Sequence, residues 1–366
     1  MPGIRILQNK VSLDPMSSQL KFAGPGVRED VLSFHRSIEG YEQTPLAELK
    51  GLADQLELGS IRIKDESFRF GLNSFKSLGA SYAIARTFGL SKLEIANTDV
   101  TLVTATDGNH GRAVAWAATR VGARSLIFIP DGADPKRISA IEAEGAEVRE
   151  GGINYENAIE CAISVSKAES HVLIQDTAWD GYEEVPELIT QGYFTMVAEA
   201  LEQSGWKWPS HVFIQAGVGS LAAGVIGAFY SYREKSVPKF VIVEPQGAAC
   251  VFESAKHGRL ITIEGRHETL MACLSCGRAS SSAWELLEQT ASAFVSCDDE
   301  TTLDGMRVLS QPTGDDPAVL SGVSGAVTAG LLYELMQDSE CSEYRDFLGL
   351  GPESNVLLFS TEGPLV

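Results

Sequence analysis

A lysine at position 76 lies in a setting that suits covalent catalysis. It occurs in the segment GLNSFKSLGASYAIAR (71–86), where Phe75 precedes it and Leu78 and Tyr82 follow it. A lysine held among apolar neighbours can have a depressed pKa, and its neutral amine can then form a Schiff base with a carbonyl group. The same spacing also fits a solvent-facing lysine near the start of a helix. Lys76 is therefore a candidate nucleophile, with a surface lysine as the alternative.

A second candidate is the loop in TATDGNHGRAVAWAA (104–118), which connects an apolar run to a helical pattern. Gly108 and Gly111 allow a ligand to approach the backbone closely, and free amides at a helix start can hold a carboxylate. Asn109 can donate a hydrogen bond to an oxyanion. The alternative is a capped turn in which Asp107 or Asn109 serves as the helix N-cap.

The stretch QAGVGSLAAG (215–224) follows a strand pattern and begins a helix pattern. Gly217 and Gly219 let the backbone approach a ligand, and the helix start favours an anion such as a phosphate. The spacing Gly217-x-Gly219-x-x-Ala222 also satisfies the dinucleotide fingerprint, with Glu244 at the end of the next strand as a ribose-binding carboxylate. Phosphate binding, an NAD site and a purely structural turn all fit this stretch.

The elements that must position these loops follow from hydrophobic periodicity. Short apolar runs alternate with helical patterns from about residue 100 onward. We predict strands at 101–105, 125–130, 171–175, 211–215, 239–244 and 356–360. We predict helices around 138–145 and at 109–121, 154–168, 187–204, 220–233, 299–310 and 324–337. This alternation indicates an α/β fold with parallel sheets covered by helices on both faces, in two domains that meet near residue 185.

The charge balance excludes several classes of partner. The 366 residues include 49 acidic and 29 basic ones, which gives a net charge of −20. Such a charge repels nucleic-acid phosphates and anionic lipids, so we expect neither as a partner. No secretory signal is visible, and the apolar stretch around residue 220 fits a strand, loop and helix better than a membrane span. We expect a cytoplasmic protein.

The six cysteines are too sparse for a disulfide scaffold. Cys273 and Cys276 form one C-x-x-C motif, but a structural zinc site usually needs a second pair, so we expect no metal. A disulfide between Cys250 and one of these two cysteines stays open.

Taken together, the three loops resemble the tryptophan-synthase-like, fold type II class of pyridoxal-phosphate enzymes, and within it the diaminopropionate ammonia-lyase family. NSFKSLG matches the family's cofactor-lysine motif, and TDGNHGRAVAWAA matches its asparagine loop. QDTAWDGYEEVP, QAGVGSLAAG, VEPQGAAC, SGAVTAGLL and LFSTEG follow in the family's order, so that the resemblance spans roughly residues 28 to 363. It makes the glycine stretch a cradle for a cofactor phosphate rather than a dinucleotide site.

The resemblance implies an α/β fold with two parallel-sheet, three-layer domains. The large domain would comprise 1–78 and 188–366, and the small domain, 79–187, would carry the Asp107-Gly108-Asn109 loop. Lys76 would bind the cofactor, pyridoxal 5′-phosphate, through a Schiff base. The other implied cofactor contacts are the neighbouring Phe75, Asn109 at the pyridine 3′-oxygen, the amides of Gly217, Val218, Gly219, Ser220 and Leu221 at the phosphate, and Ser360 or Thr361 at the ring nitrogen.

Two carboxylates complete the implied catalytic set. Related serine and threonine dehydratases typically carry a serine where Asp107 stands, so an acid there suits a substrate with a second ammonium group. Asp176, in QDTAWDGY, is the second acid. With Lys76, the two acids form a set that can remove the α-proton and protonate a departing amine. The alternative for Asp176 is a carboxylate that caps the loop after its strand.

The implied activity is that of a lyase. It would eliminate the β-substituent of a small amino acid similar to 2,3-diaminopropionate, through an aminoacrylate, to a keto acid and ammonia, and it would be a homodimer. The sequence departs from the family at Gln246, Arg278 and Val323, near regions expected to border the pocket, and it stops at Val366. A β-replacement synthase, a serine- or threonine-type dehydratase and a non-catalytic cofactor-binding protein therefore stay open.

Overall fold

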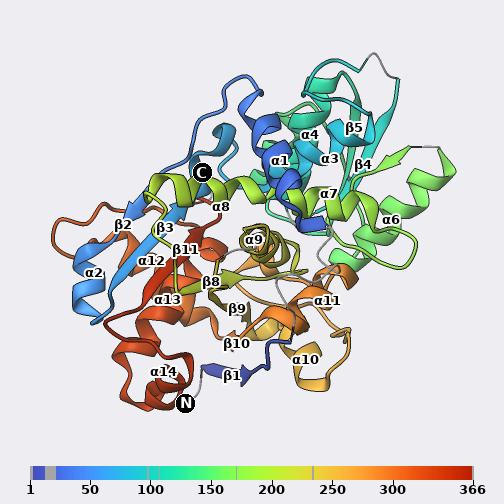
Figure 1. Cartoon of the computed structure of the whole chain (residues 1–366). Coiled ribbons are helices and arrows are strands. Elements are labelled where there is room, and N and C mark those ends of the chain that lie inside the picture. Colours follow the sequence, from blue (N-terminus) through green and yellow to red (C-terminus); the bar gives the residue numbers. More distant parts are fainter. Residues whose placement is uncertain are drawn as a thin grey trace.

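The computed structural model describes residues 3–12, 22–96, 99–106, 108–169, 171–232 and 235–364. Asp107, one of the predicted catalytic residues, lies outside the described residues. Two separate sheets organise the described chain, and helices pack around both of them (Figure 1). This arrangement confirms the predicted α/β class.

The larger sheet has seven strands in the order β1-β10-β9-β8-β11-β3-β2. They are β1 (Ile4–Gln8), β2 (Leu46–Glu48), β3 (Ser60–Asp65), β8 (His211–Gln215), β9 (Lys239–Pro245), β10 (Ala293–Cys297) and β11 (Asn355–Ser360). The five inner strands are parallel, whereas β1 and β2 pair antiparallel with their neighbours at the two edges. The strand–helix pattern predicts three of the inner strands, β8, β9 and β11, but not β3, β10 or the two edges. β1, β2 and β3 precede the region where the pattern begins.

The smaller sheet has four parallel strands in the order β6-β5-β4-β7. They are β4 (Thr101–Ala105), β5 (Arg124–Ile129), β6 (Glu147–Glu150) and β7 (Val172–Leu173). All four lie within the predicted small domain, 79–187, and the strands of the larger sheet lie outside it. The positions of the domain boundaries stay a prediction.

Helices fill the layers on either side of the sheets. The α-helices of the described chain are α1 (Pro25–Arg36), α2 (Lys50–Gln55), α3 (Lys76–Thr87), α4 (Asn109–Val121), α5 (Pro135–Glu142), α6 (Tyr155–Ala168), α7 (Glu184–Gly192), α8 (Phe194–Gln203), α9 (Ser220–Tyr230), α10 (Cys250–His257), α11 (Ser281–Thr290), α12 (Asp299–Ser310), α13 (Val323–Gln337) and α14 (Ser342–Leu348). Short 3-10 turns include η2 (Glu66–Gly71), η3 (Gln246–Ala248), η4 (Ala272–Leu274) and η5 (Ser339–Cys341). None of the helices in this described part is long and apolar enough to cross a membrane.

Side chains alternate across the larger sheet as the two-residue period of a strand requires. In β8, Val212 and Ile214 belong to the core that includes α9, whereas Phe213 belongs to the core that includes α13. All three side chains are fully buried. The sheet is therefore covered on both faces, which explains why its inner strands are continuous apolar runs.

The helix predicted at 187–204 is in fact two helices, because α7 ends at Gly192 and α8 begins at Phe194. A Cβ atom on Gly192 would lie only 2.6 Å from the carbonyl oxygen of Leu78, so α7 packs closely against α3. Apolar positions continue through the junction, and periodicity alone therefore does not reveal the break. The strand predicted at 171–175 is also shorter than expected, since β7 covers only Val172–Leu173.

The segments singled out in the sequence lie at the carboxyl ends of parallel strands, which is the usual place for ligands in such sheets. The Asn109 loop follows β4, and Asp176 follows β7 in the smaller sheet. The Gly217 loop follows β8, and Thr361 follows β11 in the larger sheet. The two sheets thus present their candidate residues to a shared space between them.

Candidate active site

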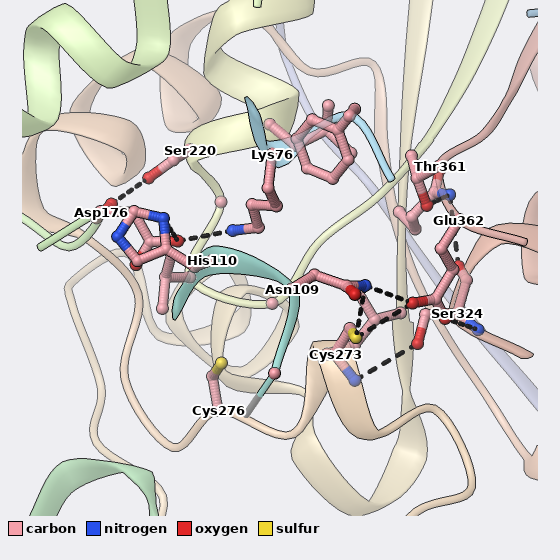
Figure 2. Close-up of a pocket in the computed structure, with 18 of the residues that line it drawn as sticks. Lys76, Asn109, His110, Asp176, Ser220, Cys273, Cys276, Ser324, Thr361 and Glu362 are labelled. Atoms are coloured by element: carbon pink, nitrogen blue, oxygen red, sulfur yellow. Dashed lines mark hydrogen bonds and ion pairs between the residues drawn. The ribbon is translucent and has the colours of Figure 1, made fainter. Parts of the chain in front are cut away.

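One cavity brings the predicted segments together (Figure 2). Its lining residues are Phe75, Lys76, Gly108, Asn109, His110, Tyr155, Asp176, Gln215, Gly217, Val218, Gly219, Ser220, Leu221, Cys273, Leu274, Cys276, Ser324, Thr361 and Glu362. Every predicted site residue that the structure describes is among them except Ser360. The three loops therefore form a single site.

Lys76 is the first residue of α3, and its side chain extends into the cavity (Figure 2). Its Nζ lies 2.5 Å from Oδ2 of Asp176, and only 18% of the lysine side chain is exposed. Burial alone would lower the pKa of Lys76, but the Asp176 carboxylate raises it above its usual value. The sequence-based expectation of a depressed pKa is therefore wrong, and so is the alternative of a surface lysine.

Asp176 is held on both carboxylate oxygens. Oδ2 accepts the hydrogen bond from Lys76, and Oδ1 accepts one from the Tyr155 hydroxyl at 3.0 Å. Burial alone would raise the pKa of Asp176, but the neighbouring Lys76 ammonium, with a smaller contribution from His110, lowers it below its usual range. The carboxylate faces the cavity, and it is the main-chain oxygen of Asp176 that accepts from Ser220 Oγ, at 2.6 Å. This geometry argues against the capping alternative for Asp176.

Asn109 occupies the first position of α4, and Gly108 is the N-cap residue. Gly108 has φ +147°, which favours glycine, and the backbone amide of Gly111 in the first turn donates to Thr106 Oγ1 at 3.1 Å. The side-chain amide of Asn109 instead donates to Glu362 Oε2 at 2.6 Å and to Cys273 Sγ at 3.3 Å. The alternative in which Asn109 caps the helix is therefore wrong.

The loop between β8 and α9 is open to the cavity at a helix N-terminus. Gly219 precedes α9 with φ +91°, a conformation that side chains rarely adopt, and the first turn of α9 contains no acidic residue. A Cβ atom on Gly217 would lie 3.2 Å from Cys276 Sγ, so the backbone is closely packed there as well. Unpaired amides at the start of a helix suit a phosphate.

Glu244 does not complete a dinucleotide site. Its buried carboxylate accepts hydrogen bonds from the backbone amides of Val251 and Phe252, at 2.8 and 2.6 Å. It therefore closes the N-terminus of α10 and does not line the cavity. The interpretation of Glu244 as a ribose ligand is wrong.

The structure separates the two hydroxyl candidates for the ring nitrogen. Thr361 lines the cavity, and its Oγ1 accepts a hydrogen bond from Gln215 Nε2 at 2.8 Å. The hydroxyl of Ser360 is buried and lies 2.9 Å from Ser321 Oγ, away from the cavity lining. Thr361 therefore remains the candidate for the contact with the ring nitrogen, and Ser360 does not.

Several cavity residues were not predicted from the sequence. Glu362 receives hydrogen bonds from Asn109 and from the backbone amide of Ser324, and Cys273 Sγ lies 3.1 Å from the same carboxylate. Glu362 stands inside the LFSTEG motif, which is the one signal that could have identified it. His110 stands in the TDGNHG loop beside Asn109, and that loop is the signal that could have identified it. No motif of the sequence analysis contains Tyr155.

The three departures from the family pattern lie outside the cavity lining. Gln246 and Arg278 are exposed, and Arg278 donates to Thr262 Oγ1 at 2.7 Å. Val323 is partly buried at the start of α13. The segments that contain Arg278 and Val323 do reach the cavity, through Cys276 and Ser324, but the three departing side chains themselves do not line it.

The six cysteines, all within the described residues, form no disulfide with one another, so the bond left open between Cys250 and Cys273 or Cys276 is not formed. Among the residues that the structure describes, no group of three histidine, cysteine or acidic side chains is arranged to hold a metal ion.

The cavity residues fit pyridoxal phosphate. An amine, a glycine loop at a helix N-terminus and a neutral hydroxyl line one space, and they match the aldehyde, the phosphate and the ring nitrogen of that cofactor. Gln215 Oε1 is buried on the same wall without a hydrogen-bond partner in the described chain. Such unsatisfied atoms are rare in folded proteins, and a polar group bound beside Gln215 accounts for this one.

Comparisons with known proteins agree with this site. Residues 38–348 match the family described as pyridoxal-phosphate dependent enzyme. The chain is 40% identical to the diaminopropionate ammonia-lyase of Salmonella typhimurium, over 94% of this chain and 91% of that enzyme. It is 39% identical to the diaminopropionate ammonia-lyase of Escherichia coli, over 90% of this chain and 86% of that enzyme.

Solved structures show the same relationship. The diaminopropionate ammonia-lyase of Escherichia coli, in complex with an aminoacrylate-PLP azomethine reaction intermediate, matches with a TM-score of 0.90 and 37% identity. The match covers 98% of this chain and 94% of that one. Threonine deaminase from Solanum lycopersicum, at 22% identity and a TM-score of 0.76, shares the fold. The chain therefore belongs to the diaminopropionate ammonia-lyases, a family of fold type II pyridoxal-phosphate-dependent enzymes.

Proposed function

We propose that this chain is an ammonia-lyase for a small amino acid with a second amino group on its β-carbon, such as 2,3-diaminopropionate. The products are ammonia and a keto acid. Membership of the family supports the reaction class. The observation that carries the proposal is the ion pair of Lys76 and Asp176, 2.5 Å apart on the wall of the cavity that contains the glycine loop. A β-elimination needs a group that takes the α-proton and a group that protonates the leaving nitrogen.

The cofactor would be held by residues from both sheets. Bound pyridoxal phosphate supplies an electron sink that makes the α-proton of an amino acid acidic. Lys76 would hold its aldehyde carbon, Thr361 its ring nitrogen and Asn109 its ring oxygen, with Phe75 beside Lys76. The backbone amides of Gly217, Val218, Gly219, Ser220 and Leu221 would hold its phosphate. A neutral hydroxyl at the ring nitrogen, rather than a carboxylate, is the choice that the fold type II class makes for β-elimination.

Lys76 and Asp176 would divide the proton transfers. In the ion pair the lysine is an ammonium and the aspartate a carboxylate. Asp176 raises the pKa of Lys76, and Lys76 lowers the pKa of Asp176, so that each stabilises the charged form of the other. Withdrawal of a proton toward Asp176 leaves Lys76 as a neutral amine, which is the form that can attack a carbonyl or take an α-proton. When the proton returns from Asp176 to Lys76, the lysine is again an ammonium group that can protonate the leaving nitrogen. The two residues can therefore act on either side of the elimination.

Asp107 is proposed as the residue that selects a diamino substrate. Its neighbour Gly108 lines the cavity, and a carboxylate at that position of the loop would attract a β-ammonium group. The serine of related dehydratases would not. This role predicts that amino acids with a β-hydroxyl are poorer substrates than those with a β-amino group.

Membership of the family, rather than any single cavity residue, favours elimination over β-replacement. The departures Gln246, Arg278 and Val323, which kept that alternative open, lie outside the lining. The side chains that line the cavity keep the amine, the carboxylate and the amide that elimination uses.

Product analysis tests the proposed function. The purified chain, loaded with pyridoxal phosphate, is mixed separately with 2,3-diaminopropionate, serine and threonine, and keto acid and ammonia are measured. We expect rapid release of both products from the diamino acid and slower release from the hydroxy amino acids. Turnover of serine or threonine with none of the diamino acid would assign a dehydratase instead. A lasting aminoacrylate absorbance without keto acid would indicate β-replacement.

We further propose a homodimer that acts in the cytoplasm, as the family resemblance implies. Light scattering on the purified chain tests the assembly, and a mass equal to one chain would contradict it. Fractionation of cells that express the chain tests the location.

A further inference from the structure

The ring nitrogen Nδ1 of His110, a residue that lines the cavity, is buried and has no hydrogen-bond partner within the described chain. His110 belongs to the first turn of α4, and 4% of the residue is exposed. Its Nε2 lies 2.9 Å from the carbonyl oxygen of Ile174. Because a carbonyl can only accept, Nε2 carries a proton and Nδ1 of the neutral ring has a free lone pair.

That lone pair is directed at a carboxylate. His110 Nδ1 lies 3.9 Å from Oδ2 of Asp176, the oxygen that also holds Lys76 (Figure 2). A neutral Nδ1 and an ionised Oδ2 are both acceptors, so they repel each other unless a proton lies on one of them. The contact is favourable when a proton lies between the two atoms, either on Nδ1, which then forms an ion pair with Asp176, or on Oδ2, which then donates to Nδ1.

The other polar groups around the contact between His110 and Asp176 already form hydrogen bonds. Tyr155, from α6, donates to Oδ1 of Asp176 and receives a hydrogen bond from Gln175 Nε2 at 2.7 Å. Lys76, from α3, donates to Oδ2. The charged groups that His110 faces are therefore Asp176, which raises the pKa of its ring, and Lys76, which lowers it together with burial. Lys76 and His110 compete for the same carboxylate oxygen.

We propose that His110 is a positioning residue that stores a proton for Asp176 while Lys76 is engaged elsewhere in the reaction. The proposal rests on the proposed elimination. When Lys76 leaves Oδ2, the carboxylate loses its counter-cation, and His110 Nδ1 replaces it by taking up a proton. Lys76 and His110 thereby alternate as the cation beside Asp176, which keeps the carboxylate paired in a buried site.

The proton balance of the elimination closes with this store. The Cα–H bond breaks, and its proton passes through Asp176 to Nδ1. The β-ammonium group first loses one proton to solvent, and the stored proton returns through Asp176 to this neutral β-amine as the Cβ–N bond breaks with its electron pair on nitrogen. A carbon–carbon double bond forms and neutral ammonia departs. From the neutral β-amine onward no proton is gained or lost, and no oxidant or further reactant is needed.

A purely structural role makes a different prediction. In that case His110 would act only through the hydrogen bond from Nε2 to Ile174. Glutamine places a donor near the position of Nε2 and has nothing at Nδ1, so His110→Gln keeps the structural bond and removes the store. Asparagine places a polar group near Nδ1 that does not titrate, so His110→Asn is the complementary variant.

Nuclear magnetic resonance of the loaded enzyme tests the proton store without substrate. The enzyme is labelled with nitrogen-15 in its six histidines, and the His110 signals are assigned by their loss in His110→Gln. We expect a neutral ring protonated at Nε2 that takes its second proton at Nδ1. Asp176→Asn is expected to lower the pKa of His110 by about one pH unit or more, because it removes the facing anion. A ring protonated at Nδ1 in its neutral form, or a pKa that Asp176→Asn leaves unchanged, would overturn the proposal.

Kinetics provide the second measurement. We expect His110→Gln and His110→Asn each to lower kcat by about tenfold or more, less than the loss of a direct general acid or base. Both are expected to lose one limb of the pH profile of kcat while KM and cofactor affinity change little. A His110→Gln enzyme with the wild-type kcat and pH profile would assign a structural role. Failure of the proposed function would appear separately, as the absence of keto acid from the wild-type enzyme with the diamino acid.

Discussion

Asp176 changes the chemistry of Lys76 more than the apolar neighbours of the lysine do. The apolar side chains that surround Lys76 in the sequence predict a depressed pKa, yet the carboxylate 2.5 Å away has the opposite effect. A lysine ammonium of raised pKa reacts with a carbonyl only after its proton has moved to another group. Asp176, and through it His110, therefore control when the amine becomes available.

Replacing Asp176 by asparagine tests this control. Asp176→Asn is expected to lower kcat by about 10²-fold or more, because the substitution removes a group that exchanges protons with the reacting amine. Cofactor absorbance and thermal stability are expected to change little. The matched control is Asp180→Asn, an exposed position in the same loop, which is expected to keep the wild-type kcat. Full activity in Asp176→Asn would show that the ion pair only supports the fold.

Gly219 carries a prediction about cofactor binding. Gly219→Asp places a side chain at φ +91° and a negative charge at the start of α9, where the cofactor phosphate is proposed to bind. Like charges brought together in this way cost several kcal/mol, so we expect the dissociation constant for pyridoxal phosphate to rise by about 100-fold or more. Fluorescence titration of the apoenzyme measures this constant.

Gly258→Asp serves as the control for that substitution. Gly258 is an exposed glycine with φ +61° and no atom near its Cβ position, so the same new side chain is introduced far from the cavity. We expect its dissociation constant to match that of the wild type. Equal affinity in both variants would place the phosphate elsewhere.

The residue scale is also where the limits of sequence reasoning are clearest. Lys76, Asn109 and the glycine loop stand in local motifs, and the structure brings all of them to one cavity. The partners of these residues come from distant segments: Glu362 reaches Asn109 across 253 positions of the chain. Such pairs depend on how the two sheets face each other, and no local pattern contains that information.

At the scale of elements, a buried charge network connects β3, η2 and α8. Glu199 in α8 receives Lys64 of β3 at 2.6 Å and Arg69 of η2 at 2.8 Å, and all three side chains are fully buried. Arg69 also pairs with Glu66 at 2.8 Å. Each charge in this network is matched, so the loss of one member leaves another buried without a partner.

Glu199→Gln is expected to lower the free energy of unfolding by about 3 kcal/mol or more, since Lys64 and Arg69 lose a shared buried anion. Chemical denaturation at neutral pH measures the change. The control is Glu202→Gln, which removes the partner of Arg36 in a pair that is partly exposed and is expected to cost about 1 kcal/mol or less. A loss no larger than that of the control would show that the network is not a source of stability.

The same network predicts an acid dependence. Burial alone would raise the pKa of Glu199, but Arg69 and Lys64 lower it to about 2, below the unfolded value of about 4.3. A lowered folded-state pKa means that the stabilisation is complete above the unfolded value and is lost as the pH falls toward 2. The wild type is therefore expected to lose its advantage over Glu199→Gln between about pH 4 and pH 2.

Element prediction succeeded where a segment had one clear period. The predicted helices 109–121 and 299–310 and the strand 211–215 agree with α4, α12 and β8. It failed at the junction of α7 and α8, where the apolar period continues although α7 ends at Gly192 and α8 begins at Phe194. It also missed the antiparallel edges β1 and β2, because edge pairing is decided by the rest of the sheet.

At the scale of the whole molecule, two of the departures from the family, Gln246 and Arg278, are exposed, and none of the three lines the cavity. Arg278 is exposed and donates to Thr262 Oγ1. Arg278→Ala is therefore expected to change kcat/KM for the diamino acid by less than about twofold, as is usual for surface positions away from a site. Steady-state kinetics measures this ratio. A change of about tenfold or more would mean that Arg278 reaches the substrate in the working enzyme.

The central claim is that Lys76 carries the cofactor, and chemical labelling tests it most directly. Borohydride reduction of the loaded enzyme, followed by digestion and mass spectrometry, identifies the lysine to which pyridoxal phosphate becomes permanently attached. We predict a single label on the peptide that contains Lys76, and no label in Lys76→Ala. Lys64, the buried lysine held by Glu199, is predicted to stay unlabelled and provides an internal control. A label on Lys64 or any other lysine, or a reducible adduct that persists in Lys76→Ala, would contradict the account.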